Sequence, residues 1–223
     1  MSKISFKNTK SSYHMQEGIK NLRMNLLFTR DDRKVVVVTS SLASEGKTST
    51  TIELCKSLAQ INKKVLLIDA DMRKSVMVTR VDGARNVKGL AHFLSGQAKL
   101  SEVLTVTEIP NLHVIMAGTT VMNAAELLSS PRFEKMLESL REHYEYIIID
   151  GAPVGLVVDS AIIGKHCDCG VFVVESGKVK YKFIQKAIAR LESSDCPVLG
   201  VVLNKFDMKK GGDSYYNKYY KEY

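Results

Sequence analysis

Short apolar runs separated by helix-length segments constrain the fold of this chain more than any other feature. Val35–Val38 is a continuous β-branched run, which is typical of a strand buried on both faces of a sheet. Segments such as Lys47–Ile61 and Lys178–Ser193 repeat apolar residues at helical spacing. Further apolar runs occupy Val65–Ile68, Leu112–Met116, Tyr146–Ile149, Gly170–Val174 and Val198–Leu203. This alternation predicts an α/β fold with a parallel sheet covered by helices on both faces.

The chain has the length and the apolar content of one domain. Its 223 residues are 45% hydrophobic, which is enough to bury a full core without disulfides. Helical spacing of apolar residues predicts an amphipathic helix over about residues 13–28, before the first strand. The apolar pattern ends at Asp207. We therefore expect one domain over residues 1–206 and a flexible, tyrosine-rich tail over residues 207–223.

Composition argues against several classes of protein. No apolar run reaches the roughly 18 residues of a spanning helix, so we expect a cytoplasmic protein without a membrane span. The formal charge of +8 is spread along the chain and no zinc-finger or RNA-binding motif occurs, so no nucleic-acid partner is expected. Cys167 and Cys169 are expected on one face of a strand, where they serve packing, the alternative being a metal or a redox partner. All four cysteines, which include Cys55 and Cys196, are expected to be reduced thiols.

A phosphate-binding loop follows the first predicted strand. The segment SLASEGKT, residues 41–48, matches the P-loop template except that Ser41 stands at the usual first glycine. Gly46 lets backbone N–H groups approach phosphate oxygens, Lys47 offers a cation to the β- and γ-phosphates, and Thr48 offers a hydroxyl to Mg²⁺. The predicted ligand is therefore ATP with Mg²⁺. The predicted nucleotide contacts are Ser44, Glu45, Gly46, Lys47, Thr48 and Ser49.

Aspartates follow two more predicted strands. VLLIDADMRK places Asp69 and Asp71 after one strand, and YIIIDGAP places Asp150 after another. Carboxylates at strand ends beside a P-loop indicate a Mg²⁺ site, and one of them can orient or deprotonate an incoming hydroxyl. Arg73 is expected to pair with phosphate or to hold the acidic cluster in place. The alternative for any single aspartate is a turn or a helix cap.

These residues resemble those of a known family, the bacterial tyrosine kinases that control capsular and exopolysaccharide synthesis. The likeness lies in GKT of the P-loop, in DADMR as a second Walker A-type motif and in IIIDGAP as Walker B. EGIKNLRMN, residues 17–25, is similar to the subunit-contact helix of the family, and NAAELLSSP, residues 123–131, to its Asn-Pro-x-Glu-Leu-Leu segment. The nearest likeness is to the Gram-positive form, in which a separate membrane protein activates a soluble kinase chain.

The resemblance implies a role for each matched residue of the nucleotide site. Lys47 and Thr48 would bind ATP·Mg. Asp71 and Asp150, together with Thr48, would serve the metal. Asp69 would act on the hydroxyl of the acceptor tyrosine.

The resemblance also implies partners. Glu17, Lys20 and Arg23 would contact the neighbouring subunit of a ring, in which tails are phosphorylated between neighbours. A transmembrane activator of the polysaccharide co-polymerase type would recruit the chain to the inner face of the plasma membrane, and a protein tyrosine phosphatase would oppose it. Lys20 lacks the bidentate fork of the arginine usual at its position, which is expected to weaken ring contacts.

Other departures from the family pattern lie near the nucleotide motifs. Ser75 and Ala124 each stand where proline is common, and Gly151 stands where Ser or Thr is frequent. These substitutions bear on assembly and on the level of activity, while every expected ligand is kept.

The last nine residues hold five of the chain's nine tyrosines, and no Leu, Ile, Val or Met lies between them. A core stripe or a stacking platform for single-stranded nucleic acid are the alternatives to a substrate role. Phosphates would reverse the net charge of +2 over residues 209–223. The predicted phosphoacceptors are Tyr215, Tyr216, Tyr219, Tyr220 and Tyr223.

Two other functions compete with an ATP-dependent tyrosine autokinase. A switch ATPase of the division and partition kind carries a lysine near the start of its P-loop, but Leu42 occupies that position here. A catalytically silent adaptor of polysaccharide assembly would bind ATP through the same residues, so the sequence leaves this alternative open.

Overall fold

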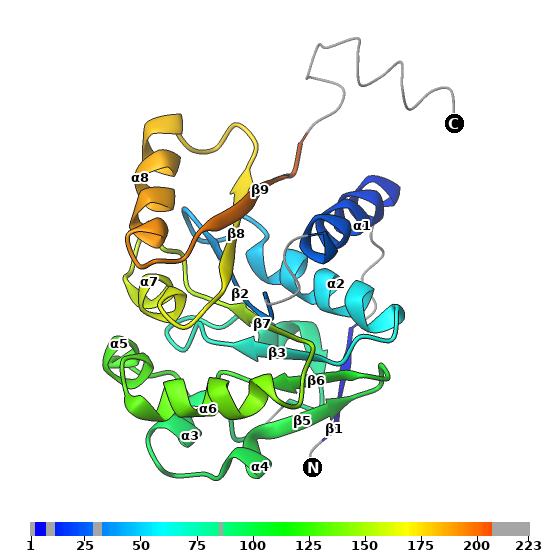
Figure 1. Ribbon diagram of the computed structural model, residues 1–223, viewed down its shortest axis with the longest axis vertical. Coiled ribbons are helices and arrows are strands. Elements are labelled where there is room, and N and C mark those ends of the chain that lie inside the picture. Colours follow the sequence, from blue (N-terminus) through cyan, green and yellow to red (C-terminus); the bar gives the residue numbers. More distant parts are fainter. Residues whose placement is uncertain (1–2, 8–11, 29–32, 85–86, 207–223) are drawn as a thin grey trace.

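One sheet runs through the centre of the molecule (Figure 1). The computed structural model describes residues 3–7, 12–28, 33–84 and 87–206. Within these residues, nine strands follow the order β4-β1-β5-β6-β3-β7-β2-β8-β9. They are β1 (Lys3–Phe6), β2 (Val35–Ser40), β3 (Val65–Asp69), β4 (Val81–Asp82), β5 (Leu104–Thr107), β6 (Leu112–Ile115), β7 (Tyr146–Asp150), β8 (Cys169–Glu175) and β9 (Val198–Asn204). All six strands predicted from the apolar runs are confirmed.

The central strands pair in parallel and bring three chemically important segments together. β7 lies between β3 and β2, in a register that pairs Asp150 with both Asp69 and Val38. β2, β3 and β7 all run toward the same edge of the sheet. The segments that follow Ser40, Asp69 and Asp150 therefore meet at that edge. This edge is called the carboxyl edge below.

The central strands form the predicted parallel sheet, and the outer part adds two antiparallel pairings. β5 runs antiparallel to β6, and β4 runs antiparallel to β1. β1, β4 and β5 were not predicted, because each has at most four residues and none has a continuous apolar run. Short, partly exposed strands carry too weak a pattern to be recognised in the sequence.

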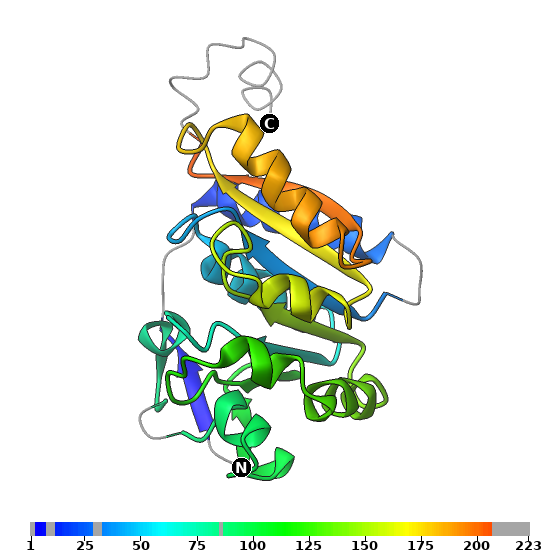
Figure 2. The ribbon, with the colours of Figure 1, turned by 90° about the vertical axis from the view of Figure 1, so that its left-hand side faces the viewer.

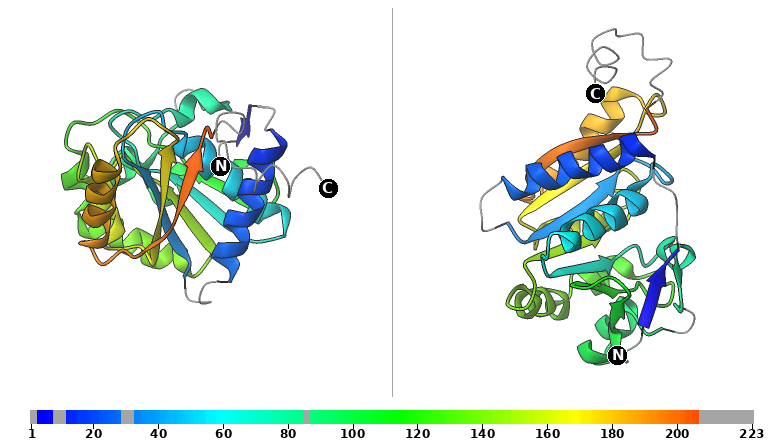
Figure 3. Two further views of the ribbon diagram at one scale, coloured as in Figure 1. Left: turned by 90° about the horizontal axis from the view of Figure 1, so that it is seen from above. Right: turned by 90° about the vertical axis from the view of Figure 1, so that its right-hand side faces the viewer.

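Helices cover both faces of the sheet, as predicted. α1 and α2 lie side by side on one face, and α5, α6, α7 and α8 lie on the other (Figures 1 and 3). Figure 2 shows α7 and α8 in front of the central strands. The helices are α1 (Tyr13–Leu27), α2 (Lys47–Gln60), α3 (Leu90–Leu94), α4 (Leu100–Val103), α5 (Ala124–Leu128), α6 (Pro131–Arg141), α7 (Asp159–Gly164) and α8 (Tyr181–Glu192), with a 3₁₀ turn η1 (Met77–Arg80).

The strand β2 shows why the sequence produces two cores. Val36 and Val38 pack in the cluster under α1 and α2, whereas Val35 and Val37 pack in the cluster under the opposite helices. Alternate residues of a strand face opposite sides of the sheet, so a run of four valines serves both layers.

The cysteine prediction needs one correction. All four cysteines are free and buried. Cys167, however, packs in the cluster on the α6 side, and Cys169 packs in the cluster on the α2 side. β8 begins only at Cys169, so Cys167 still belongs to the turn after α7, and its side chain does not follow the alternation of the strand. No helix among the described residues has the length and hydropathy needed to cross a bilayer.

Candidate active site

The loop between β2 and α2 has the geometry that a phosphate-binding loop requires. Gly46 precedes α2 with a φ of 93°, a conformation that side chains rarely adopt. A Cβ at this position would lie 1.9 Å from Nδ2 of Asn204, so only glycine fits. The strand, loop and helix context predicted for residues 41–48 is therefore confirmed.

Lys47 and Thr48 both contact the aspartate at the end of β7. Lys47 Nζ lies 2.7 Å from Oδ1 of Asp150, and the side chains are only 7% and 1% exposed. The Thr48 hydroxyl donates to Oδ2 of Asp150 at 2.6 Å, and that of Thr51 donates to Oδ1 at 3.3 Å. The P-loop and the predicted Walker B aspartate thus form one buried cluster.

Asp69 lies beside Asp150 and is fully buried. Burial and then the charge of Asp150 raise the pKa of Asp69 to about 7, while Ser75 and Lys47 oppose the rise. The Ser75 hydroxyl donates to Oδ2 of Asp69. The proline common at this position in the family has no donor for this contact. Asp69 can therefore both gain and lose a proton near neutral pH.

Asp71 and Arg73 follow on the same segment. Asp71 accepts a hydrogen bond from the Lys74 backbone N–H at 3.1 Å. Arg73 forms a bidentate ion pair with Asp159, with N–O distances of 2.7 and 3.1 Å, and also donates to the Met122 carbonyl at 2.9 Å. Asp159 was not predicted from the sequence. Among the described residues the hydrogen-bonded anion of Arg73 is Asp159 and not a strand-end aspartate, and the expected pairing of Arg73 with phosphate stays a prediction.

The predicted nucleotide contact Glu45 has its side chain turned into the protein. One carboxylate oxygen accepts from the Ser41 hydroxyl at 2.7 Å and from the Leu42 N–H at 2.6 Å. The other accepts from the Glu175 N–H at 3.2 Å. Ser41, at the position of the usual glycine, therefore has a structural role in the loop, and Glu45 offers only its backbone to a ligand.

A recess of about 850 Å³ opens above this cluster. Its wall includes the predicted residues Ser44, Gly46, Lys47, Thr48, Ser49, Asp71 and Arg73. Asp69 and Asp150 lie buried behind the wall. The sequence analysis missed further lining residues, among them Met15 of α1, Pro153 after β7, and Asn204 and Lys205 at the end of β9. The rule that ligands bind beyond strand ends would have found the last two, since they directly follow a predicted strand.

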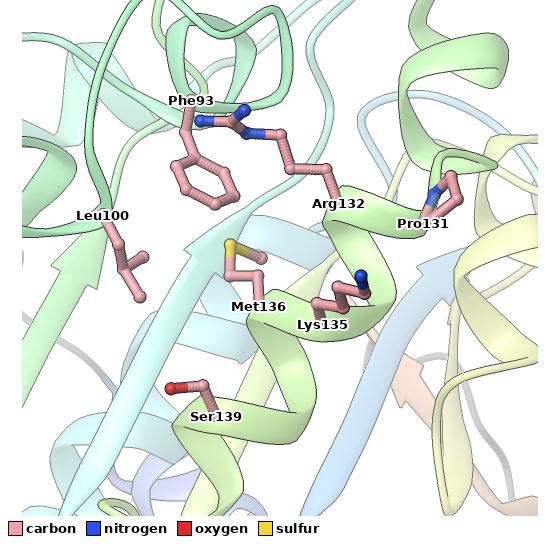
Figure 4. A pocket seen from close by; sticks show the side chains of 7 residues that line it. All are labelled: Phe93, Leu100, Pro131, Arg132, Lys135, Met136 and Ser139. Carbon is pink, nitrogen blue, oxygen red and sulfur yellow. The ribbon is translucent and has the colours of Figure 1, made fainter.

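A second, shallower recess lies between α6 and the segment around α3 and α4 (Figure 4). The Arg132 guanidinium lies 4.6 Å from the centre of the Phe93 ring, and Met136 and Leu100 form the apolar floor. None of the predicted site residues lines it, so the recess at the carboxyl edge is the candidate active site.

Gly151 and Ala124, two residues that depart from the family pattern, are both buried. A Cβ on Gly151 would lie 2.3 Å from the Ser160 hydroxyl and 3.3 Å from a Val37 methyl group, so α7 fills the space that Ser or Thr would need. Ala124 is the first residue of α5 and is buried.

The predicted subunit-contact residues lie on α1. Lys20 pairs with Glu17 on the same helix at 2.6 Å. Arg23 instead reaches α2, where it donates to the carbonyl and hydroxyl oxygens of Ser57 at 3.1 and 3.0 Å. All five predicted phosphoacceptor tyrosines lie outside the described residues.

Comparison with known proteins defines the class of protein first. A family model described as an AAA domain matches residues 33–176, from β2 to the end of β8. The fold is shared with the septum site-determining protein MinD of Pyrococcus horikoshii, complexed with Mg-ADP, at a TM-score of 0.66 over 79% of this chain and 72% of that one, with 22% identity. The chain is thus an ATP-binding, P-loop NTPase-like protein of the AAA domain family.

The nearer matches are tyrosine kinases. The tyrosine-protein kinase CpsD of Streptococcus pneumoniae is 41% identical over 210 residues, covering 93% of this chain and 92% of the relative. The crystal structure of the VpsO kinase domain aligns with a TM-score of 0.80 and 30% identity, over 87% of this chain and 95% of that one. The chain belongs to the family of bacterial tyrosine kinases, and its activity is that of a protein-tyrosine kinase.

Proposed function

We propose that the chain transfers the γ-phosphoryl group of ATP, bound with Mg²⁺, to tyrosines 215, 216, 219, 220 and 223 of neighbouring copies. The observation that carries this proposal is the convergence of Lys47, Thr48, Asp69 and Asp150 from adjoining strand ends at the base of one recess. Family membership supplies the reaction, and the tyrosine cluster supplies acceptors within the same sequence.

The oxygen donors of the recess fit Mg²⁺. Asp71 lines the wall, and the Thr48 hydroxyl and the Asp150 carboxylate lie within 2.6 Å of one another. Mg²⁺ is held in such sites by one or two carboxylates, with phosphates and water as its remaining ligands. When bound, the ion would offset negative charge on the β- and γ-phosphates. We assign Thr48, Asp71 and Asp150 to the metal, and Lys47 to the phosphates.

Asp69 is the best candidate for the group that accepts the tyrosine proton. A general base works best when its pKa is near the working pH, and burial beside Asp150 brings Asp69 into that range. Ser75 fixes the orientation of the carboxylate through its hydrogen bond to Oδ2. The remaining oxygen, Oδ1, lies 3.3 Å from the Asp71 N–H and is the one we assign to the substrate hydroxyl.

We further propose that the chain works as a homo-oligomer, expected to be a ring, in capsular or exopolysaccharide biosynthesis. A transmembrane co-polymerase-type activator would recruit it to the inner face of the plasma membrane, and a protein tyrosine phosphatase would reverse the modification. The α1 pair Glu17 and Lys20 remains the proposed subunit contact, joined by Arg23. Arg23→Ala would also remove both bonds to Ser57 within the chain. Ser57→Ala, which removes the hydroxyl acceptor and keeps the carbonyl, controls for the side-chain part of that loss in any oligomer test.

A mixing experiment tests the proposal directly. Lys47→Met removes the cation that faces the phosphates, which is expected to cost on the order of 3 kcal/mol or more of transition-state stabilisation. This inactive chain, with its tail intact and a distinguishing tag, is mixed with an active chain whose five tail tyrosines are replaced by phenylalanine. Phosphotyrosine on the inactive chain, located by mass spectrometry, is the expected result. Modification that occurs only in cis, or outside the tail, would contradict it.

A further inference from the structure

Side chains at the ends of β8 and β9 bind consecutive carbonyl groups of the phosphate loop. Lys178 Nζ lies 3.5 Å from the carbonyl oxygen of Ala43, and Lys205 Nζ lies 2.9 Å from that of Ser44. Asn204 Nδ2 donates to the carbonyl oxygen of the next residue, Glu45, at 2.9 Å. The carbonyl groups of three successive residues are thus held by side chains from these two strand ends.

Glu175 joins the two lysines. Its Oε2 atom lies 2.7 Å from Nζ of Lys178 and 3.0 Å from Nζ of Lys205. These hydrogen bonds lower the pKa of Glu175, so the carboxylate is charged at neutral pH. Its backbone N–H donates to the Glu45 carboxylate. Glu175, Lys178 and Lys205 therefore form one connected unit, called the β8–β9 bracket below.

The two residues joined by the hydrogen bond from Lys205 to the Ser44 carbonyl both have an unusual backbone conformation. Ser44 has a φ of 66° and Lys205 a φ of 54°. The other non-glycine residues with positive φ in the described part of the chain are asparagines or an aspartate, which tolerate this region better. An unfavourable backbone conformation at both partners of one hydrogen bond must be maintained by the surrounding structure, and such positions concentrate at functional sites.

Peptide geometry gives this arrangement a consequence for ligand binding. In a trans peptide, the C=O of one residue and the N–H of the next point in opposite directions. Side chains that hold the carbonyls of Ala43, Ser44 and Glu45 therefore direct the N–H groups of Ser44, Glu45 and Gly46 away from themselves. Ser44 and Gly46 line the recess, and successive N–H groups of this kind form a concave anion site.

We propose that Lys178, Lys205 and Glu175 are positioning residues for the nucleotide phosphates. They fix the phosphate loop from outside, so that its N–H groups are oriented before the nucleotide arrives. This inference rests on the proposed binding of ATP·Mg in the recess. It assigns no catalytic role to the two lysines.

Calorimetry with ADP and Mg²⁺ as the probe tests the bracket. The variant Lys178→Met/Lys205→Met keeps side-chain length and removes both donors, and we expect its affinity to fall roughly tenfold or more. Lys182→Met/Lys186→Met is the matched control, because it removes two exposed lysines from α8 and the same net charge. We expect the control to change affinity by less than about twofold, since exposed charges at a distance are screened. The bracket lysines are 35% and 50% exposed, so the fold is expected to survive.

Two further measurements separate positioning from other effects. Lys178→Arg/Lys205→Arg keeps both donors and is expected to restore most of the affinity. At saturating ATP, the Met variant is expected to keep a phosphorylation rate within a few-fold of wild type, so that KM changes more than kcat. Equal losses in the Met variant and the control, or unchanged affinity in both, would overturn the inference. Wild-type chain that binds Mg-ADP but forms no phosphotyrosine would instead refute the proposed function and leave the bracket intact.

Discussion

The two edges of the central sheet hold charged residues in opposite ways. At the amino edge, where the strands begin, the Asp168 carboxylate accepts from the backbone N–H groups of Lys34 and Val35 at 2.8 and 2.7 Å. It also pairs with both terminal nitrogens of Arg141, at 2.9 and 2.8 Å. The Asp168 carboxylate thus faces a cation of opposite charge and accepts four hydrogen bonds in all.

The carboxyl edge lacks this balance. Asp69 and Asp150 are neighbours in the interior, and the Lys47 ammonium group pairs with Asp150. Burial, and then the charge of Asp150, raises the pKa of Asp69 to about 7. Like charges that are buried together cost stability, and proteins keep them where a ligand or a reaction requires them. The comparison indicates that the amino edge stabilises the fold, whereas the carboxyl edge is organised for the nucleotide.

The largest expected effect separates the two carboxylates of the DADMR segment. Asp69→Asn is expected to slow phosphoryl transfer by about 10²- to 10⁴-fold, because the base is lost, with little change in nucleotide affinity. Asp71→Asn is expected to raise the Mg²⁺ concentration needed for activity. Rates of phosphotyrosine formation across a Mg²⁺ titration check both.

The same variants also test how the paired carboxylates affect the free energy of unfolding. Asp69→Asn removes one of two neighbouring buried charges, so it is expected not to lower the free energy of unfolding. If high Mg²⁺ rescued Asp69→Asn but not Asp71→Asn, the two assigned roles would have to be exchanged.

At the amino edge, we expect a substitution to lower the stability of the fold and to leave the kinase activity unchanged. Asp168→Ala leaves two backbone N–H groups and Arg141 without their acceptor, and we expect a loss of about 2 kcal/mol in the free energy of unfolding. The pair is 23% and 31% exposed, which is why the loss is smaller than for a fully buried ion pair. Kinase activity per folded molecule should not change. Urea unfolding measures the first quantity, and Glu134→Gln, at an exposed site on the same helix as Arg141, is the control.

The sequence predicted the carboxyl edge better than it predicted the sheet around it. Lys47 and Thr48 were recognisable from the P-loop template, and Asp69 and Asp150 because each directly follows a continuous apolar run. The structure brings the four residues together. β1, β4 and β5 were missed because short edge strands have no such run. Asp159 and the β8–β9 bracket were missed for another reason: their contacts join residues more than 80 positions apart, and no local pattern encodes them.

Arg73 gives a prediction of intermediate size at the boundary of the active site. Its guanidinium binds Asp159 through two nitrogens, a geometry that lysine cannot reproduce. Arg73→Lys is therefore expected to reduce the rate of phosphorylation by roughly tenfold, which corresponds to a loss of about 1.4 kcal/mol of transition-state stabilisation. A structural role alone would lower thermal stability without changing activity at low temperature. Measuring both at 15 °C and 37 °C distinguishes the two.

The smallest expected effect returns to the amino edge, at His113. Its Nδ1 atom shares a hydrogen bond of 2.7 Å with the Tyr144 hydroxyl, and burial, followed by the charge of Lys64, lowers the pKa of His113. Burial also raises the pKa of Tyr144 to about 12, so the hydroxyl keeps its proton at neutral pH.

A histidine whose folded pKa lies below its unfolded value binds fewer protons in the folded state. The stability that depends on neutral His113 is therefore fully present above the unfolded pKa and is lost as the pH falls below that value and through the lower folded pKa. We expect the free energy of unfolding of the wild type to decrease from pH 7.5 to pH 5.5 more than that of His113→Asn, which cannot titrate. Unfolding curves at both pH values measure the difference. Parallel losses in the two proteins would show that acid acts on groups other than His113. Asp69 is not such a group, because its raised pKa means that the folded state binds its proton more tightly and gains stability as the pH falls.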